Sequence, residues 1–281
     1  MQEVQEGSRL EFPCVACGAM LRFAAGQNAL ACEHCGHREE IPATSDGVAE
    51  RGFDDYDRPR ATDWGTSTKT YTCRPCGAVT TVEATATSFT CPFCESNQVD
   101  VSERTDRLRP ESLVPFAFDR DAAASKIKGW ISGLWFRPNG LAKVARVDRM
   151  HGVYLPHWTF ATLTQSFWEA EAGPHYYEEE TYKDAQGNKQ TRRVQKTRWV
   201  PASGNHQAFF DDVLVPATKG VDGSLLSGAG SFDTQNLVTY DPRYLAGWAA
   251  EDYAREMPDC WPDAQSRIDS SIRSACIRKI P

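Results

Sequence analysis

The stretch CVACGAMLRFAAGQNALACEHC (residues 14–35) holds two Cys-x-x-Cys pairs that are separated by fourteen residues. The stretch CRPCGAVTTVEATATSFTCPFC (residues 73–94) repeats this arrangement at a constant offset of 59 residues. The agreement extends beyond the thiols, because Phe12 corresponds to Tyr71 and Leu30 to Phe89. The chain therefore contains an internal repeat of one four-thiol unit.

Each unit is suited to a zinc ion. Zinc takes four ligands at tetrahedral corners, with sulfur at about 2.3 Å, and each Cys-x-x-Cys turn supplies two of them. Glycine follows the second cysteine in three of the four turns, where a left-handed backbone conformation is expected, and Glu95 takes this place in the fourth. We predict two zinc ribbons with two structural Zn²⁺ ions. The predicted metal ligands are Cys14, Cys17, Cys32, Cys35, Cys73, Cys76, Cys91 and Cys94.

Redox chemistry and disulfide bonds are the competing interpretations of these cysteines. A redox-active Cys-x-x-Cys is expected at a helix N-terminus in a βαβ pattern, whereas both stretches here are rich in strand formers and glycine. Four thiolates also close the coordination sphere, which indicates a structural zinc and not a catalytic one. We interpret His34 and His37 as surface residues, and Cys260 and Cys276 as partly buried thiols outside any site.

The composition is that of a folded protein with an acidic surface. The chain of 281 residues is 41% hydrophobic and 25% charged, and its formal net charge is −7. The first residues lack the features of a secretory signal, and no segment reaches the ~20 apolar residues that a membrane helix needs. We therefore expect a cytoplasmic protein with no membrane span, and the negative charge disfavours nucleic acid as a partner.

The expected fold class is α+β, with two small four-cysteine ribbons before a β-rich α+β domain. The segments between the ribbons are rich in Gly, Pro, Ser, Thr and charged residues and lack hydrophobic periodicity, so we expect the first linker to isolate ribbon 1 from the rest. The predicted division is 1–42 for ribbon 1, 43–67 for a linker, 68–101 for ribbon 2, 102–112 for a connector and 113–281 for the α+β domain.

The α+β domain begins with a predicted amphipathic helix that ends near Arg137-Pro138. Asp119 or Asp121 is its candidate N-cap. Apolar residues recur at helical spacing and are expected to face the core; they are Ala123, Ile127, Trp130 and Leu134. A second helix is predicted near the end of the chain, starting at Pro262.

Strands are predicted between these helices. Residues 151–173 alternate in polarity, and His151 and His157 within them are expected to be ordinary strand histidines. Residues 175–200 predict a long hairpin about Gln186-Gly187-Asn188, in a register that sets Glu180 opposite Arg193 and Thr181 opposite Arg192. Residues 209–218 predict a further strand, with Asp211 and Asp212 interpreted as turn or cap residues, and residues 244–257 are ambiguous.

Several short sequence motifs, in order along nearly the whole chain, resemble those of a bacterial family of transcription-factor-IIB-type zinc-ribbon-containing proteins, often labelled primosomal-helicase-N′-like. The resemblance implies a zinc-ribbon protein of a family sometimes encoded beside membrane-stress proteins, which makes those proteins candidate partners. Longer members of the family continue past the point matching Pro281. No G-x-x-x-x-G-K-[ST] loop is present to support a helicase motor. The motifs that carry the resemblance are LVPF (113–116), WF-x-P (135–138), GVYLPHWTF (152–160), DDVLVPAT (211–218) and YLAGW-x-AEDY (244–253).

Three functions are weighed on these observations. The first is a non-catalytic scaffold or adaptor that uses its ribbons to bind a protein partner. The second is a nucleic-acid-binding protein, but residues 10–40 carry four acids against two bases and residues 68–100 carry three against two. The third is an enzyme, for which the sequence offers no nucleophile with its base and no open metal site. We predict the scaffold, with nucleic-acid binding as the alternative.

Overall fold

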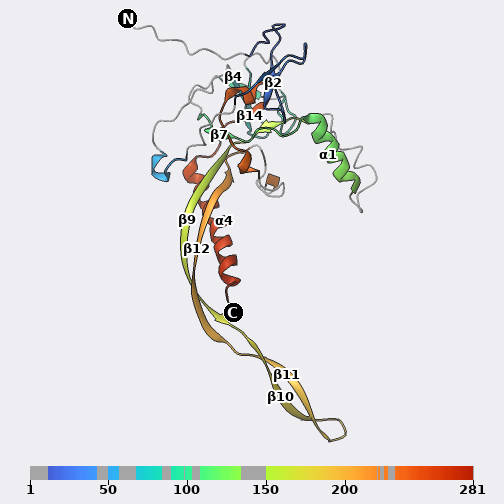
Figure 1. The fold of residues 1–281 in the computed structure, drawn as a ribbon, viewed down its shortest axis with the longest axis vertical. Helices are drawn as coiled ribbons and strands as arrows, with labels where there is room; N and C mark the ends of the chain where they lie inside the picture. Colours follow the sequence, from blue (N-terminus) through green and yellow to red (C-terminus); the bar gives the residue numbers. More distant parts are fainter. Residues whose placement is uncertain are drawn as a thin grey trace. The chain divides into compact units, whose positions relative to one another are not determined.

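The computed structural model describes residues 12–42, 50–56, 68–83, 90–97, 99–102, 108–133, 150–219, 221, 225–226 and 232–280 (Figure 1). The chain divides by its internal contacts into two compact units. Unit 1 comprises residues 1–158 and 216–260, and unit 2 comprises residues 159–215 and 261–280 together with Pro281. Strands dominate the described residues and long helices are few, which is compatible with the expected α+β class. The predicted domain boundaries remain predictions.

The first four-cysteine stretch forms a small antiparallel sheet. Its strands are β1 (Arg22–Ala24), β2 (Ala29–Ala31) and β3 (Arg38–Glu40), in the order β1-β2-β3. Phe23 pairs with Leu30 across the first hairpin, and both side chains are buried. Two left-handed residues in the connecting turn, Gly26 and Asn28, allow the chain to reverse within four residues.

This first sheet packs against distant parts of unit 1. The buried cluster that contains Leu21, Phe23 and Leu30 also contains Leu113, Tyr244 and other residues that follow Val238. Tyr244 Oη donates to Asn28 Oδ1 at 2.6 Å, and its ring lies 5.1 Å from that of Phe23 in an edge-on arrangement. The expectation that the linker isolates ribbon 1 is therefore wrong, because its hydrophobic residues share one core with segments more than 200 residues away.

The second four-cysteine stretch also joins a larger sheet. Its strands are β4 (Thr68–Cys73), β5 (Val79–Glu83) and β6 (Val99–Ser102). They form a five-stranded sheet in the order β6-β4-β5-β14-β8, where β8 is Val153–Tyr154 and β14 is Ala249–Glu251. The ambiguous segment 244–257 thus contributes a strand, preceded by the 3-10 helix η4 (Pro242–Leu245).

Smaller elements complete unit 1. Strands β7 (Ser112–Leu113) and β13 (Val238–Thr239) pair antiparallel, and the 3-10 helices η1 (Phe53–Asp55) and η3 (Thr234–Asn236) lie in connecting segments. Most of the predicted linker and the middle of the predicted connector lie outside the described residues. Among the described residues, no helix combines the length and the apolar character needed to cross a membrane.

Helix α1 (Arg120–Gly133) confirms the first predicted helix but not its buried face. Asp119 is the N-cap, because its Oδ1 accepts from the backbone N–H of Ala122 at 2.8 Å. Ile131 is buried, whereas Trp130 is 67% exposed and Ile127 is 37% exposed. The prediction that Ile127 and Trp130 face the core is therefore wrong, because the side of the helix that packs against the protein is the one that carries Ile131. Leu134 and the predicted helix end lie outside the described residues.

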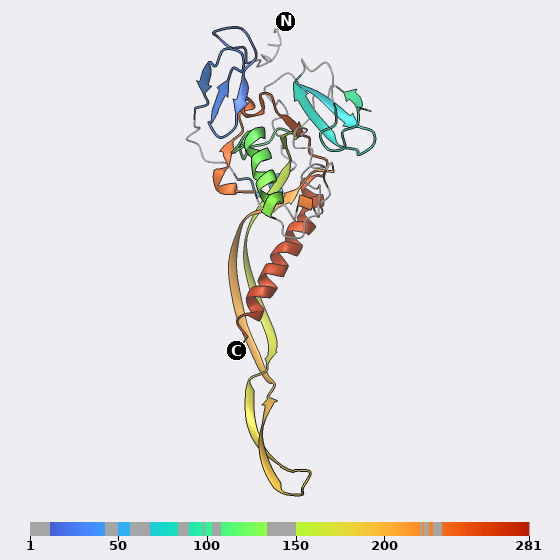
Figure 2. The same ribbon diagram turned by 90° about the vertical axis from the view of Figure 1, so that its right-hand side faces the viewer.

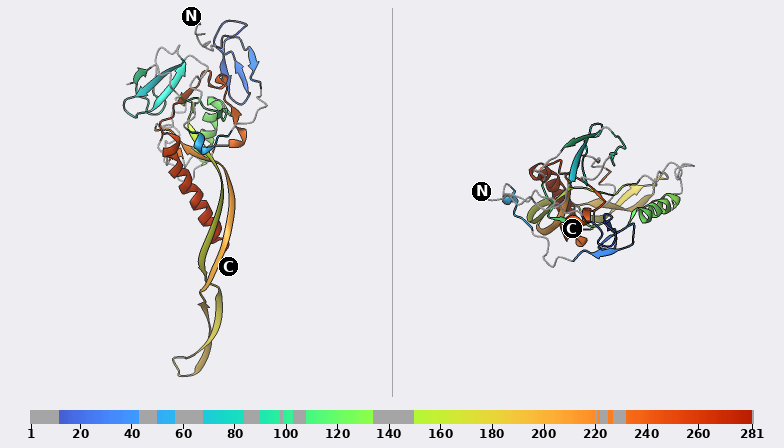
Figure 3. Two further views of the ribbon diagram at one scale, coloured as in Figure 1. Left: turned by 90° about the vertical axis from the view of Figure 1, so that its left-hand side faces the viewer. Right: turned by 90° about the horizontal axis from the view of Figure 1, so that it is seen from above.

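Unit 2 is a β ribbon accompanied by a helix (Figures 2 and 3). Strands β9 (His157–Ala172) and β12 (Val200–Pro216) pair, and β10 (His175–Lys183) and β11 (Lys189–Thr197) pair in the hairpin between them. Helix α4 (Met257–Ile277) runs beside the β9–β12 ribbon. It begins before Pro262, because Pro258 already occupies the first turn, where a missing N–H costs nothing.

The hairpin register differs from the predicted one by one residue. Glu180 pairs with Arg192, and Thr181 pairs with Thr191, because the loop has five residues and is centred on Gln186. Asp184 holds this loop, since its Oδ1 accepts from the backbone N–H groups of Gln186 at 3.0 Å and Asn188 at 2.8 Å. A slip of one residue exchanges the two faces of a ribbon.

The two predicted turn residues near position 211 lie inside β12. Asp212 has φ +48° and interrupts the regular strand, which is typical of a β-bulge. Their interpretation as turn or cap residues is therefore wrong. His157 lies in β9 as predicted, with Nδ1 3.0 Å from the backbone oxygen of Leu155, and His151 lies before β8.

Candidate metal centres

The structure brings the eight predicted cysteines together into two groups of four. Within each group the sulfur atoms all lie within 4.8 Å of one another. In cluster 1 the Cys14 and Cys35 sulfurs are 3.5 Å apart, as are those of Cys17 and Cys32. Cluster 2 repeats this pattern, at 3.5 Å for Cys73 and Cys94 and at 3.6 Å for Cys76 and Cys91.

Each of the four Cys-x-x-Cys turns has the same backbone geometry. In the first turn, the N–H of Gly18 donates to the Cys14 carbonyl at 2.8 Å, and the N–H of Cys14 donates to the Ala19 carbonyl at 2.7 Å. The turns that begin at Cys32, Cys73 and Cys91 contain the same two bonds, at 2.8 to 3.0 Å. The first cysteine of every pair is buried, so each turn presents one inner and one outer thiol.

The left-handed residue after each pair explains the glycine pattern. Gly18, Gly36 and Gly77 have φ between +73° and +77°, and a Cβ at these positions would meet nothing within 4 Å. Glycine is therefore needed for the backbone conformation and not for space. Glu95 adopts the same conformation, with φ +59°, so the fourth turn keeps the shared geometry despite its side chain.

Backbone N–H groups point at the thiol sulfurs. The N–H of Cys35 donates toward the sulfur of Cys32, and this contact contributes most to lowering the pKa of that thiol to about 6. The N–H of His37 favours the thiolate of Cys35, but the neighbouring thiols and burial outweigh it and raise the pKa of Cys35 to about 12. In cluster 2, burial raises the pKa of Cys76 to about 12. Thiols with a raised pKa stay protonated without a metal, and a bound cation would stabilise all four sulfurs as thiolates.

The donor set and its dimensions fit zinc. Four sulfurs at ~2.3 Å from a common tetrahedral centre lie ~3.8 Å from one another, close to the separations in both clusters. A disulfide would instead require ~2.05 Å, and all ten cysteines are free. Two tetra-cysteine sites of metal-binding dimensions are thus present, and their tetrahedral set of thiols is one that suits zinc.

The other predicted residues lie outside these clusters. His37 approaches Glu39, with Nε2 and Oε1 3.3 Å apart, and His34 is exposed beside Cys35. Cys260 and Cys276 are buried on α4 and belong to neither four-cysteine group. Among the described residues, the groups of metal-ligating type are these two clusters.

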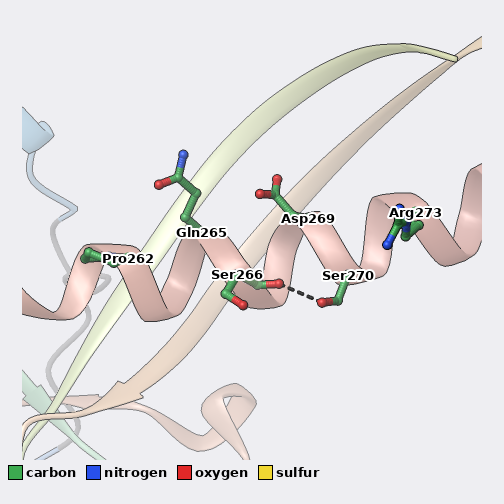
Figure 4. A pocket seen from close by; sticks show the side chains of 6 residues that line it. All are labelled: Pro262, Gln265, Ser266, Asp269, Ser270 and Arg273. Carbon is green, nitrogen blue, oxygen red and sulfur yellow. Dashed lines mark hydrogen bonds between the residues drawn. The ribbon is translucent and has the colours of Figure 1, made fainter.

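A hollow of about 400 Å³ lies along one polar face of α4 (Figure 4). The hydroxyl of Ser270 donates to the backbone oxygen of Ser266 at 2.8 Å, and Ser274 repeats this bond one turn later. These hydroxyl protons are therefore used within the helix. The described lining residues all come from α4, and they are Pro262, Gln265, Ser266, Asp269, Ser270 and Arg273.

Comparison with known proteins finds a distant relative. The chain is 25% identical over 267 residues to the uncharacterized protein YdjG of Bacillus subtilis strain 168, and the match covers 94% of this chain and 72% of YdjG. No family model and no solved structure matches the chain. The resemblance to transcription-factor-IIB-type zinc-ribbon proteins therefore remains a prediction.

We expect purified protein to contain two zinc ions per chain, because both clusters have the same closed set of four thiols. Elemental analysis by inductively coupled plasma mass spectrometry, together with the mass of the native protein, measures both the identity and the number of the ions. One ion, none, or iron in place of zinc would contradict this expectation.

Proposed function

We propose that this chain is a zinc-binding, non-catalytic scaffold or adaptor whose two structural zinc ribbons help to present surfaces to a protein partner. The observation that carries the proposal is the pair of closed four-thiol clusters. A zinc ion with four protein ligands has no open position for water or substrate, so it stabilises structure and does not activate a nucleophile. Small folds of this kind gain much of their stability from the metal.

The packing of the clusters supports a structural role for the metal. Cys14 and Cys32 belong to the same buried cluster as Leu113 and Tyr244, so a metal at cluster 1 would stabilise a core shared with distant segments. Cluster 2 stands at the end of β4, whose sheet also includes β14 and β8. We infer that the zinc ions stabilise the core and the sheet of unit 1, and that unit 1 carries the surfaces that bind a partner.

Charge supports a protein partner over nucleic acid. Residues 10–40 and 68–100, which contain the two clusters, are each net acidic, and four thiolates with one Zn²⁺ add about −2 at each site. Two basic side chains of the hairpin are paired with acids, since Lys196 Nζ lies 2.7 Å from Glu178 and 3.2 Å from Glu180, and Arg192 Nη2 lies 3.3 Å from Glu180. Nucleic-acid binding at physiological salt draws on several unmatched cations. We propose membrane-stress proteins, in the cytoplasm, as partners to test first.

A titration with nucleic acids tests this proposal. Fluorescence anisotropy of labelled single-stranded and double-stranded DNA and RNA, at ~150 mM salt, is expected to stay flat as the zinc-loaded protein is added. In parallel, immobilised protein is expected to retain the same partner in repeated experiments, and to lose it after zinc is removed. Sub-micromolar binding that weakens steeply with salt would replace the scaffold with the nucleic-acid alternative.

A further inference from the structure

The outer edge of β9 is unprotected along residues 159–168. Within the described part of the chain, β9 pairs with β12 alone and the two form a two-stranded sheet. Proteins protect exposed strand edges with charged side chains, Pro or a bulge, because unpaired N–H and C=O groups recruit another strand. β12 has Pro201 and the left-handed residue Asp212, whereas residues 159–168 of β9 contain no charged residue, no Pro or Gly and no left-handed residue.

The two faces of the ribbon differ. One face meets α4, since Phe160 is buried with its ring 5.4 Å from that of Trp261. The opposite face exposes large apolar side chains, namely Leu163 at 66%, Phe167 at 77% and Phe209 at 64%. An exposed apolar face beside an unprotected edge is typical of a surface that pairs with another strand.

Helix α4 contacts both strands of this sheet. Trp261 packs near Phe160 of β9, and on β12 Arg267 Nη1 donates to the Leu214 carbonyl and Lys279 Nζ donates to the Asn205 carbonyl at 3.2 Å. If the β9–β12 strand pair of a second chain adds to β9, the centres of the two strand pairs lie two strand spacings apart, which is ~9.6 Å. Two helices pack side by side at ~8–10 Å, so the α4 helices of both chains fit on the shared face of the sheet.

We propose that β9 pairs antiparallel with β9 of a second copy of this chain, about a two-fold axis at Gln165, to give a four-stranded sheet in the order β12-β9-β9-β12. Residues directly opposite each other in an antiparallel strand pair lie on the same face of the sheet. Both residues of each opposite pair must therefore have odd residue numbers, or both must have even ones. With the axis at Gln165, Leu163 lies opposite Phe167 of the second copy and Phe167 lies opposite its Leu163. This axis brings together Leu163 and Phe167, the large exposed apolar residues of the strand.

The same register separates the acidic side chains. Glu169 falls opposite Ala161 and Glu171 opposite Thr159, so no acid of β9 faces another acid. The two copies of Glu169 are eight residues apart along the strand, about 27 Å, which exceeds the Debye length of ~8 Å at physiological salt. An axis at Phe167 would instead set Leu163 opposite Glu171. Charge and apolar pairing therefore favour the same axis.

A second copy fits this edge better than an anionic partner does. β9 and β12 contain no Lys or Arg, and their acids are Glu169, Glu171, Asp211 and Asp212. This composition repels phosphate and anionic lipid headgroups. The self-complementary register is available to every pair of chains, as a two-fold interface requires.

Analytical ultracentrifugation of the full zinc-loaded chain tests the proposal. The unaltered protein is expected to dimerise as its concentration rises. Gln165→Glu places two carboxylates directly opposite each other at the axis, and is expected to raise the dimer dissociation constant about fivefold to tenfold. Gln207→Glu is the matched control, because it adds the same charge to an exposed residue of the neighbouring strand β12, and it is expected to change the constant much less.

A disulfide experiment tests the position of the axis. In Gln165→Cys the two new thiols lie in one antiparallel pair with Cα atoms ~4.5–5.5 Å apart, within the range that a disulfide can join. Oxidised glutathione is expected to give a 165–165 bridge that peptide mass mapping identifies. Glu169→Cys is expected to give none. A protein that stays monomeric at all concentrations, a dimer insensitive to Gln165→Glu, or equal bridging at residue 169 would each overturn the proposal.

Discussion

Replacing Cys32 with serine is expected to remove one zinc ion and to loosen parts of unit 1 far beyond ribbon 1. A serine hydroxyl is a poor zinc ligand, and the loss of a structural zinc site removes on the order of 10 kcal/mol of folding free energy. The Cys32 side chain is itself buried in the cluster that contains Leu113 and Tyr244. The effect should therefore reach the segment around Tyr244.

Hydrogen exchange measured by mass spectrometry resolves where this happens. Residues 12–41 are expected to lose protection together with residues 238–248, because the two segments share backbone hydrogen bonds such as Phe23 N–H to the Ala246 carbonyl at 2.9 Å. Zinc content should fall from two ions to one, because the ligands of cluster 2 are all local to residues 73–94. Unit 2 is expected to keep its protection.

Cys276→Ser is the matched control for this change. Cys276 is a buried thiol on α4 that lies outside both four-cysteine groups, so the zinc content should remain two. Loss of protection limited to residues 12–41 in Cys32→Ser would show instead that ribbon 1 folds independently of the rest of unit 1.

The geometry of the cysteine turns was predictable because it is set by residues close in sequence. The x2-x14-x2 spacing gave the grouping of the thiols, and Gly18, Gly36 and Gly77 marked the left-handed positions. Glu95 shows the limit of that rule. It adopts the same left-handed conformation because the bond from its N–H to the Cys91 carbonyl, at 2.9 Å, holds the turn closed.

Contacts between distant segments were not predictable from local patterns. The phrase YLAGW (244–248) has no clear helical or strand period, and its role is to cover ribbon 1 through Tyr244 and Trp248. The apolar stripe of α1 indicated a buried Trp130, but the helix faces its core with Ile131. Sequence periodicity identifies an apolar face and does not say which neighbours are available to bury it.

The hairpin illustrates the same limit on a smaller scale. Opposite charges on its two strands support either of two registers that differ by one residue, and composition does not separate them. The length of the loop decides the register, and it depends on the contacts of Asp184 with Gln186 and Asn188. An Asx-type turn that begins at Asp184 was the signal that could have given the observed pairing.

Replacing Trp248 with alanine is expected to destabilise unit 1 by about 3 kcal/mol, the lower end of the range for such truncations because the side chain is only half-buried. The indole stacks on Phe116 with centroids 4.2 Å apart, and its Nε1 donates to the Phe23 carbonyl at 3.1 Å. Gly152 leaves the space for this ring, since a Cβ there would lie 2.2 Å from it. Truncation therefore removes a contact between ribbon 1 and the segments around residues 116 and 152.

Two measurements distinguish this effect from general loss of stability. The midpoint of urea unfolding should fall. A chelator should extract the zinc ion of cluster 1 faster, because Trp248 contacts ribbon 1. The zinc ion of cluster 2 should leave at its original rate, because that cluster has a separate core with Phe93 packed against it. Trp199→Ala is the matched control, since this indole is 66% exposed on unit 2, and it should change neither result. If Trp248→Ala leaves both zinc ions equally slow to extract, the packing around Trp248 does not stabilise cluster 1.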